Sequence, residues 1–211
     1  MAYIELKNVS KQAKNDYILN DISLEIEKGQ IVGFVGENGS GKTMLFRAIL
    51  GFIKTSGEIK IDDQVVRLNS EMPVNVGTII ETPGFINSYT GLKNLEYLAA
   101  IKNLVNKDQI IAAMKDFGMD KYKDTKVKKY SLGMRQKLAI IQSYMEGQDL
   151  LVLDEPTNGL DDEAVEIFKQ KMKSLSSQGK TILIASHDKD VINDLADKIY
   201  RVKLGKVSLM K

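Results

Sequence analysis

The sequence predicts an α/β fold with one mixed sheet, an N-terminal antiparallel β subdomain and an inserted α-helical subdomain. Three observations favour this fold class. Apolar runs at residues 31–35, 150–153 and 181–186 are typical of parallel strands buried on both faces. Two N-terminal segments alternate apolar and polar residues, as half-buried strands do, and helical spacing dominates residues 90–147. The 211 residues, 43% of them hydrophobic, can bury one substantial core, so we expect a single domain over residues 1–211.

The first strands are expected in the segments YIELKNVS and DISLEIEKGQ. In the first segment the alternation puts Tyr3 and Glu5 on one side and Ile4 and Leu6 on the other. The second segment repeats this pattern before a glycine turn. We expect the two strands to pair antiparallel.

The segment GENGSGKT, residues 36–43, lies between the apolar run 31–35 and a segment of helical composition, MLFRAIL. It matches the phosphate-loop pattern GxxxxGK[ST], in which glycines let the backbone approach a phosphate chain and successive N–H groups point at its oxygens. The start of the following helix adds partial positive charge. Lys42 is expected to reach the β- and γ-phosphates, and the Thr43 hydroxyl to ligate Mg²⁺. The predicted ligand is a nucleoside triphosphate, with further loop contacts from Gly36, Asn38, Gly39, Ser40 and Gly41.

Two other residues each have two open interpretations. Tyr17 precedes the second strand, where an exposed aromatic ring can stack on adenine, or where a tyrosine can pack at the sheet edge. Glu81 follows the apolar run 76–80. In an open α/β sheet ligand-facing groups gather at such strand ends, so Glu81 is a candidate for the nucleotide and its metal; the alternative is a surface carboxylate without a role.

The inserted helical subdomain is expected over about residues 86–146. Three segments there have helical spacing: LKNLEYLAAI, NKDQIIAAMKDFG and SLGMRQKLAIIQSYMEG. In the second of them Asn106 fits an N-cap and Gly118 a C-terminal stop.

Polar residues also follow two of the buried runs. Asp154 and Glu155 end the run 150–153, and a pair of carboxylates there is a metal and catalysis signal in a phosphate-loop protein. Asp154 would hold Mg²⁺, usually through its water, and Glu155 would polarise the attacking water as general base. His187, the only histidine, ends the run 181–186. A lone histidine normally has no special role, but this strand end favours a contact with the γ-phosphate.

Composition excludes several functional classes. Thirty basic and 28 acidic residues leave a net charge of +2, too balanced to indicate a nucleic-acid partner. The absence of cysteine excludes disulfides and thiolate metal sites. The N-terminal residues lack the apolar core of a signal peptide, and no apolar run approaches the roughly 18 residues that cross a bilayer. We therefore expect a cytoplasmic protein that reaches a membrane only through a partner.

The order and spacing of these motifs resemble the ATPase subunit of ATP-binding cassette (ABC) transporters over nearly the whole chain. The segment YSLGMRQK is similar to the family's signature LSGGQxQR, with Ser131, Gly133 and Gln136 in place, whereas Leu132 and Met134 depart from it. The segment LLVLDEPTNGLD continues the match through Asp161, the family's dimer-contact aspartate, and ASHD supplies the family's switch histidine at His187.

This resemblance implies an ABC ATPase fold that binds ATP with Mg²⁺ and uses Lys42, Glu155 and His187 in catalysis. It implies a homodimer in which each nucleotide lies between the phosphate loop of one copy and Ser131 with Gly133 of the other. It also implies a separately encoded integral-membrane permease, which would hold the chain peripherally on the inner face of the cell membrane.

The residue at position 81 indicates a substrate class. Most members of the family place a glutamine there, whereas Glu81 in the setting IIETPGF is similar to the subgroup that exports bacitracin and lantibiotic peptides and gives immunity or resistance. We therefore expect the ATP-hydrolysing subunit of a peptide-antibiotic exporter. The alternative is a soluble ABC ATPase that acts as a nucleotide-switched clamp in a non-transport assembly.

Overall fold

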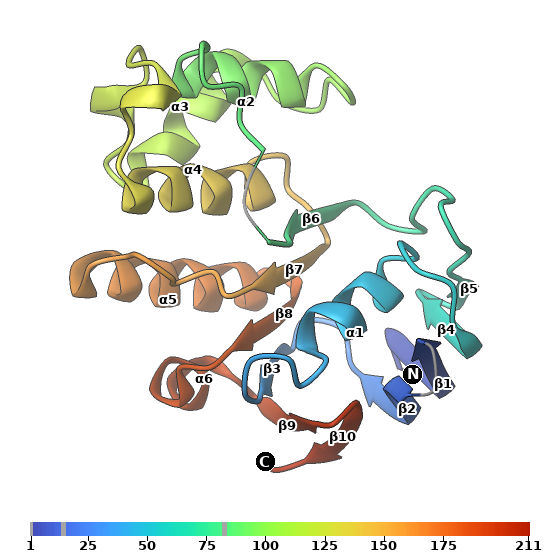
Figure 1. The fold of residues 1–211 in the computed structure, drawn as a ribbon. Helices are drawn as coiled ribbons and strands as arrows, with labels where there is room; N and C mark the ends of the chain where they lie inside the picture. Colours follow the sequence, from blue (N-terminus) through green and yellow to red (C-terminus); the bar gives the residue numbers. More distant parts are fainter. Residues whose placement is uncertain (1, 14–15, 82–83) are drawn as a thin grey trace.

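The computed structural model of the chain describes residues 2–13, 16–81 and 84–211 (Figure 1). Their strands form two sheets, one of four strands and one of six. A group of helices is inserted between two strands of the larger sheet, and other helices cover its faces. The fold class predicted from the sequence is confirmed.

The smaller sheet is antiparallel and lies at the N-terminal side. Its strands are β1 (Ile4–Ala13), β2 (Asp16–Ile26), β4 (Ser56–Ile61) and β5 (Gln64–Val65), in the order β2-β1-β4-β5. Across β1 and β2, Ile4 pairs with Ile26 and Leu6 with Leu24, and all four side chains are buried. The expected antiparallel pairing and its buried face are therefore confirmed.

Tyr3 departs from the expected alternation, because it is only 4% exposed. Strand β1 begins at Ile4, so Tyr3 lies just outside the period-two pattern. The Tyr3 N–H donates to the carbonyl of Ile26 at 2.7 Å, and its own carbonyl accepts from Asp62 at 2.8 Å. These bonds fix the backbone where the ring turns inward, and burial raises the pKa of Tyr3 to about 12.

The larger sheet is mixed and carries the strand ends identified in the sequence. Its strands are β3 (Ile31–Val35), β6 (Val76–Ile79), β7 (Leu150–Asp154), β8 (Thr181–Ser186), β9 (Lys198–Lys203) and β10 (Lys206–Leu209). Their order is β10-β9-β3-β8-β7-β6, and only the β9–β10 pair is antiparallel. Every residue of β3, β7 and β8 is buried, as expected for parallel strands covered on both faces.

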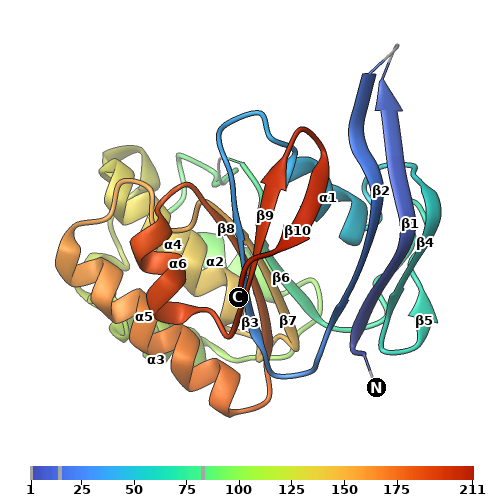
Figure 2. The ribbon, with the colours of Figure 1, turned by 90° about the horizontal axis from the view of Figure 1, so that it is seen from below.

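Six α-helices complete the described part of the fold: α1 (Lys42–Ile49), α2 (Gly91–Ala99), α3 (Lys107–Lys115), α4 (Leu132–Tyr144), α5 (Asp162–Ser177) and α6 (Lys189–Leu195). Helix α1 lies between the two sheets, and α5 and α6 lie on the opposite side of the larger sheet (Figure 2). Helices α2, α3 and α4 form the part inserted between β6 and β7. None of the helices in the described residues is long and apolar enough to cross a membrane.

Alternate residues of one strand face two different hydrophobic cores. Val32 and Phe34 of β3 join the core that also contains α1 and the antiparallel sheet, where the rings of Phe34 and Phe46 meet edge to face at 5.4 Å. Ile31 and Val35 face the second core, which includes α4, α5 and α6. Packing on both faces of the larger sheet holds its strand ends at fixed positions, which the site below requires.

The predicted signals of the second inserted helix agree with the structure at its start. Asn106 is the N-cap of α3 and forms a capping box with Gln109. The helix ends at Lys115, and Gly118, the predicted stop, follows in the left-handed region with φ 62°.

Candidate functional site

The loop between β3 and α1 turns at two glycines. Gly39 and Gly41 lie at φ 78° and 111°, in the left-handed region that favours glycine. A Cβ atom at Gly41 would also come within 3.0 Å of the carbonyl of Ile18. Helix α1 starts directly after Gly41 and has no acidic residue in its first turn, so its N-terminal N–H groups offer a favourable place for an anion.

Lys42 is the buried cation of this loop, with 6% of its surface exposed. Its Nζ donates to the carbonyl of Gly36 at 2.7 Å and to that of Glu37 at 3.3 Å. It also lies 3.7 Å from Oε1 of Glu155, which is close enough for an ion pair but too long for a hydrogen bond. The ammonium group therefore lies between the loop and the end of β7.

Asp154 and Thr43 form one polar pair beside this loop. The Thr43 hydroxyl donates to Oδ2 of Asp154 at 2.5 Å, whereas Oδ1 is buried and has no hydrogen-bond partner among the described residues. Burial raises the pKa of the Asp154 carboxyl, and the charges of Glu155 and Glu81 act in the same direction, against the Thr43 hydrogen bond and Lys42. A buried carboxylate oxygen without a partner beside a hydroxyl is a donor set that suits a hard divalent cation.

No group of three or more His, Cys, Asp and Glu residues suited to a metal occurs in residues 2–13, 16–81 and 84–211. A cation at Thr43 and Asp154 would therefore take its remaining oxygen ligands from water and from the phosphates of a nucleotide, as Mg²⁺ usually does.

Glu155 follows β7 with a positive φ of 49°. Its Oε2 lies 2.8 Å from Nδ1 of His187 and accepts weaker bonds from the His187 N–H and the Ser186 hydroxyl, both at 3.3 Å. Because a carboxylate only accepts, Nδ1 of His187 carries the proton of the short bond. Oε1 is buried and has no hydrogen-bond partner among the described residues. Glu155 is thus anchored through Oε2, whereas Oε1 accepts no hydrogen bond and lies 3.7 Å from Nζ of Lys42.

His187 lies where the sequence places it, at the end of β8, and its side chain is 57% exposed. One ring nitrogen contacts Glu155, so two of the predicted catalytic residues lie together. With Lys42 and the Thr43–Asp154 pair, the ends of β3, β7 and β8 bring five predicted site residues to one edge of the sheet.

Tyr17 is 52% exposed at the start of β2, next to a residue that contacts the loop. The carbonyl of Ile18 faces Gly41, as described above, and also the turn between β9 and β10. At that turn the Gly205 N–H donates to the carbonyl of Ser40 at 3.0 Å, and the Gly205 carbonyl accepts from Asn20 at 2.9 Å. The turn therefore joins the strand of Tyr17 to the phosphate loop.

Glu81 is paired with Arg47, which no motif of the sequence assigns to the site. Its Oε1 lies 2.5 Å from Nη2 of Arg47 on α1, and its side chain is 62% exposed. Glu81 has a positive φ of 60°, and its neighbours Thr82 and Pro83 lie outside the described residues. The structure thus connects Glu81 to α1, while its negative charge still acts on Asp154.

Ser131 and Gly133 are not brought to the phosphate loop of their own chain. Ser131 is the N-cap of α4, with its hydroxyl accepting from Met134, and its side chain is exposed. In Figure 1 the strands β7 and β8 lie between α4 and the loop that precedes α1. A Cβ atom on Gly133 would come within 2.8 Å of the Gly159 carbonyl, so the start of α4 packs closely on the segment after β7.

Gln136 is a second residue whose position the sequence analysis did not predict. It is 8% exposed, and its Nε2 donates to the carbonyls of Pro156 at 2.8 Å and Glu155 at 3.4 Å. This side chain ties α4 to the backbone of Glu155. The only sequence signal was its match to the family signature, which does not say what the side chain contacts.

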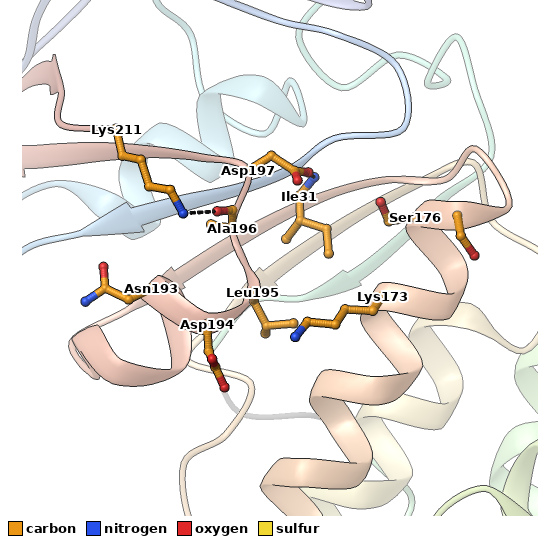
Figure 3. A pocket seen from close by; sticks show the side chains of 10 residues that line it. Ile31, Lys173, Ser176, Asn193, Asp194, Leu195, Ala196, Asp197 and Lys211 are labelled. Atoms are coloured by element: carbon orange, nitrogen blue, oxygen red, sulfur yellow. Dashed lines mark hydrogen bonds between the residues drawn. The ribbon is translucent and has the colours of Figure 1, made fainter.

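A cavity of about 620 Å³ opens at the other end of β3, where the strand starts at Ile31 (Figure 3). Two of its polar side chains already bond other groups of the lining: Nζ of Lys211 donates to the carbonyl of Ala196, and Asp197 accepts from the N–H of Ile31. Ligands of open α/β sheets bind at the carboxyl ends of the strands. The candidate site is therefore the opposite edge, at residues 36–43.

A phosphate-accepting loop after β3, with two carboxylates at the end of a neighbouring parallel strand, defines a nucleoside-triphosphatase of the phosphate-loop class. The family model for ABC transporters matches residues 19–158. The chain belongs to this family: it is the ATP-binding subunit of an ABC transporter, and it hydrolyses ATP.

Two curated relatives and one solved structure show how close the similarity is. The uncharacterised ABC transporter ATP-binding protein YybJ of Bacillus subtilis is 38% identical over 97% of this chain and 94% of its own length. The bacitracin transport ATP-binding protein BcrA of Enterococcus faecalis is 37% identical over 93% of this chain and 65% of its own. The dimeric post-hydrolysis structure of the ATP-binding cassette MJ0796 with ADP and Pi has a TM-score of 0.89 and 25% identity, covering 99% of this chain and 98% of that one.

Proposed function

We propose that this chain powers an exporter of peptide antibiotics of the bacitracin and lantibiotic type, as a homodimer bound to a separately encoded membrane permease. The observation that carries the substrate class is the glutamate at position 81, in the setting that resembles this subgroup. The 37% identity to a bacitracin transport ATP-binding protein supports the same class.

The homodimer proposal rests on the separation of two groups of predicted nucleotide ligands. Lys42 and Thr43 lie at the start of α1, whereas Ser131, which is exposed, and Gly133, which is partly exposed, lie at the start of α4. Two copies arranged head to tail bring Ser131 of each to the phosphate loop of the other, which completes the set of donors around the triphosphate charge. The dimeric form of the related MJ0796 cassette supports this arrangement.

In this proposal each residue at the loop has one task in hydrolysis. The loop N–H groups and Lys42 bind the β- and γ-phosphates, and Tyr17 stacks on the adenine. Glu155 takes a proton from the attacking water through the oxygen that His187 does not occupy, and His187 contacts the γ-phosphate. Thr43 and Asp154, with Glu81 nearby, would hold Mg²⁺, which neutralises phosphate charge when bound.

A groove beside the inserted helices supports a permease partner. A cavity of about 260 Å³ lies between the end of β6 and α4, with Phe52 and Gln142 on its walls. Phe52 is 53% exposed, so the groove combines apolar and polar contacts suited to a protein segment. We place the permease contact here, next to Glu81.

The test of this function is a transport assay with the permease, which is to be sought among the adjacent genes as a product with about six long apolar spans. Co-expression of both in a sensitive bacterium is expected to raise the concentration of bacitracin or lantibiotic that stops growth. The Lys42→Ala version of the chain, with the same permease, serves as control. Pull-down of the tagged chain from gently solubilised membranes identifies the partner, and recovery of only soluble assembly proteins would favour the clamp alternative.

Replacing Glu81 by glutamine is expected to lower transport more than ATP hydrolysis. Glutamine keeps an oxygen for Arg47 but removes the negative charge of an exposed ion pair, an interaction of at most about 1 kcal/mol. The ratio of peptide exported to ATP hydrolysed, measured in vesicles that contain the permease, reports the loss of coupling. Glu58→Gln, which removes an exposed pair with Lys60 on the antiparallel sheet, is the matched control. An unchanged ratio in Glu81→Gln would contradict the special role.

Asp154→Asn is expected to raise the melting temperature of the nucleotide-free protein by a few degrees. Burial raises the pKa of Asp154, so the folded state binds its proton more tightly than the unfolded chain does. The free energy of unfolding therefore falls as pH rises from the ordinary pKa of an aspartate through the raised pKa of Asp154. Asparagine carries no charge, so the Asp154→Asn protein does not lose this stability at neutral pH. The extra thermal stabilisation by Mg²⁺ with ATP should disappear in the same variant.

Scanning calorimetry with and without MgATP measures both effects. Asp63→Asn, at an exposed turn, is the control and should leave both unchanged. A lower melting temperature of nucleotide-free Asp154→Asn would show that the Asp154 charge stabilises the fold, contrary to this account.

A further inference from the structure

A second cavity, of about 420 Å³, lies directly beside the phosphate loop. Loop residues 36–40 form one wall. The other walls come from His187, the start of α6 and the β9–β10 hairpin, whose tip lies next to the loop in both Figures 1 and 2. Its loop wall and His187 also belong to the proposed nucleotide site, whereas Lys42, Thr43 and Tyr17 do not line the cavity. The cavity therefore adjoins the nucleotide site on the same edge of the sheet.

The walls of this cavity carry an excess of positive charge. Three exposed cations, Lys189, Arg201 and Lys203, line it, against a single carboxylate, Glu37. None of the ion pairs between described residues includes any of the three cations. Clustered charges of one sign in a concave surface focus the field and attract a partner of opposite sign. We call the cavity that Lys189, Arg201 and Lys203 line the basic cavity.

A surface of complementary charge occurs at the start of α5. Asp162 and Glu163 are exposed and, among the described residues, take part in no ion pair. The helix cap does not need them, because Asp161 already accepts from the Ala164 N–H at 2.8 Å. We call Asp162 and Glu163 the acidic start of α5.

The acidic start of α5 lies close to the signature residues. It follows Gly159 by a few residues, and Gly159 packs against Leu132 and Gly133 at the start of α4. A surface that contacts Ser131 and Gly133 therefore also comes close to the acidic start of α5, at the edge of the contact. In the proposed homodimer that surface is the phosphate loop of the second copy, and the basic cavity borders this loop.

We propose that the acidic start of α5 of one copy docks into the basic cavity of a second copy when ATP closes the dimer. The proposal rests on the homodimer of the proposed function and adds the charged contact that steers the two copies into head-to-tail register. Each dimer then contains two such contacts, related by its two-fold axis. Complementary charges of this kind act mainly on encounter and on register, and salt weakens them.

The test uses two charge-reversed proteins, both in a Glu155→Gln background so that ATP accumulates in the dimer. One carries Lys189→Glu and Arg201→Glu, and the other carries Asp162→Lys and Glu163→Lys. In a dimer of either variant alone, the cavity and the start of α5 carry charge of the same sign and repel each other. The dissociation constant of the ATP-bound dimer should therefore rise at least about tenfold. In an equimolar mixture both contacts of the heterodimer again join opposite charges, and dimer formation should return to near that of the parent.

Size-exclusion chromatography with light scattering, at low and high salt, measures the dimer, and a mass tag on one variant identifies the heterodimer. Recovery on mixing also shows that both variants are folded. Lys206→Glu, an exposed charge on β10 outside the cavity walls, is the control and should dimerise like the parent.

The outcomes distinguish the docking of the acidic start of α5 from the homodimer on which it rests. A Glu155→Gln parent that stays monomeric with ATP overturns the homodimer and this contact together. A parent that dimerises, with reversed variants that dimerise equally well alone or fail to recover on mixing, overturns the docking of the acidic start of α5 and leaves the homodimer in place.

Discussion

Replacing Glu155 by glutamine is expected to lower kcat for ATP hydrolysis by about 10²–10⁴-fold, the range that a positioned general base contributes. Glutamine has nearly the same shape and keeps an oxygen for Nδ1 of His187, which lies 2.8 Å away in the parent. It cannot take a proton from water, so ATP stays bound and the dimer closed around it persists. Phosphate release measures the rate, and size-exclusion chromatography with ATP measures the dimer.

Glu166→Gln is the matched control for this experiment. Glu166 lies on the exposed face of α5, where it pairs with Lys169, and it contacts none of the site residues described above. Its ATPase rate should equal that of the parent. If the Glu155→Gln protein hydrolysed ATP at the parent rate, Glu155 would not be the general base.

Lys42→Ala is expected to weaken ATP binding by about ten- to more than a hundredfold, because a charge-assisted hydrogen bond contributes about 1.5–3 kcal/mol and 1.4 kcal/mol is a factor of ten. Lys42 is buried, lies at the mouth of the loop and donates to the carbonyl of Gly36 at 2.7 Å. Its removal takes away the one buried cation that the loop offers to the β- and γ-phosphates. Titration with a fluorescent ATP analogue measures the affinity.

Lys180→Ala controls for the loss of a lysine that bonds carbonyl and carboxylate groups outside the loop. Thermal unfolding of both variants shows whether the fold is retained. If a folded Lys42→Ala protein bound ATP as tightly as the parent, the loop at residues 36–43 would not be the nucleotide site.

The sequence was sufficient where local chemistry decides the structure. Of the two glycines that the phosphate-loop pattern fixes, Gly36 and Gly41, the structure places Gly41 in the left-handed region, at φ 111°. The buried strands were predictable because parallel strands covered on both faces leave continuous apolar runs. Asp154 and His187 followed from these runs, because the carboxyl ends of parallel strands share one edge of the sheet.

Contacts between side chains from distant segments were not predictable in the same way. Arg47 on α1 pairs with Glu81 near the end of β6, 34 positions away, and neither segment contains a pattern that predicts this contact. Gln136 reaches the backbone after β7 only because α4 packs on that segment. Such contacts depend on how the inserted helices lie on the sheet, which periodicity does not specify.

The turn at Gly205 has a consequence for base selectivity. The turn is hydrogen-bonded both to the loop at Ser40 and to strand β2 at Asn20. A Cβ atom at position 205 would lie 2.5 Å from the Ile18 carbonyl, so there is no space for a larger residue. The turn thus fixes the position of the phosphate loop relative to the strand that carries Tyr17. A larger residue at position 205 would disturb this spacing and is expected to weaken ATP and GTP alike, because stacking on Tyr17, the proposed contact of the base, does not distinguish between purines.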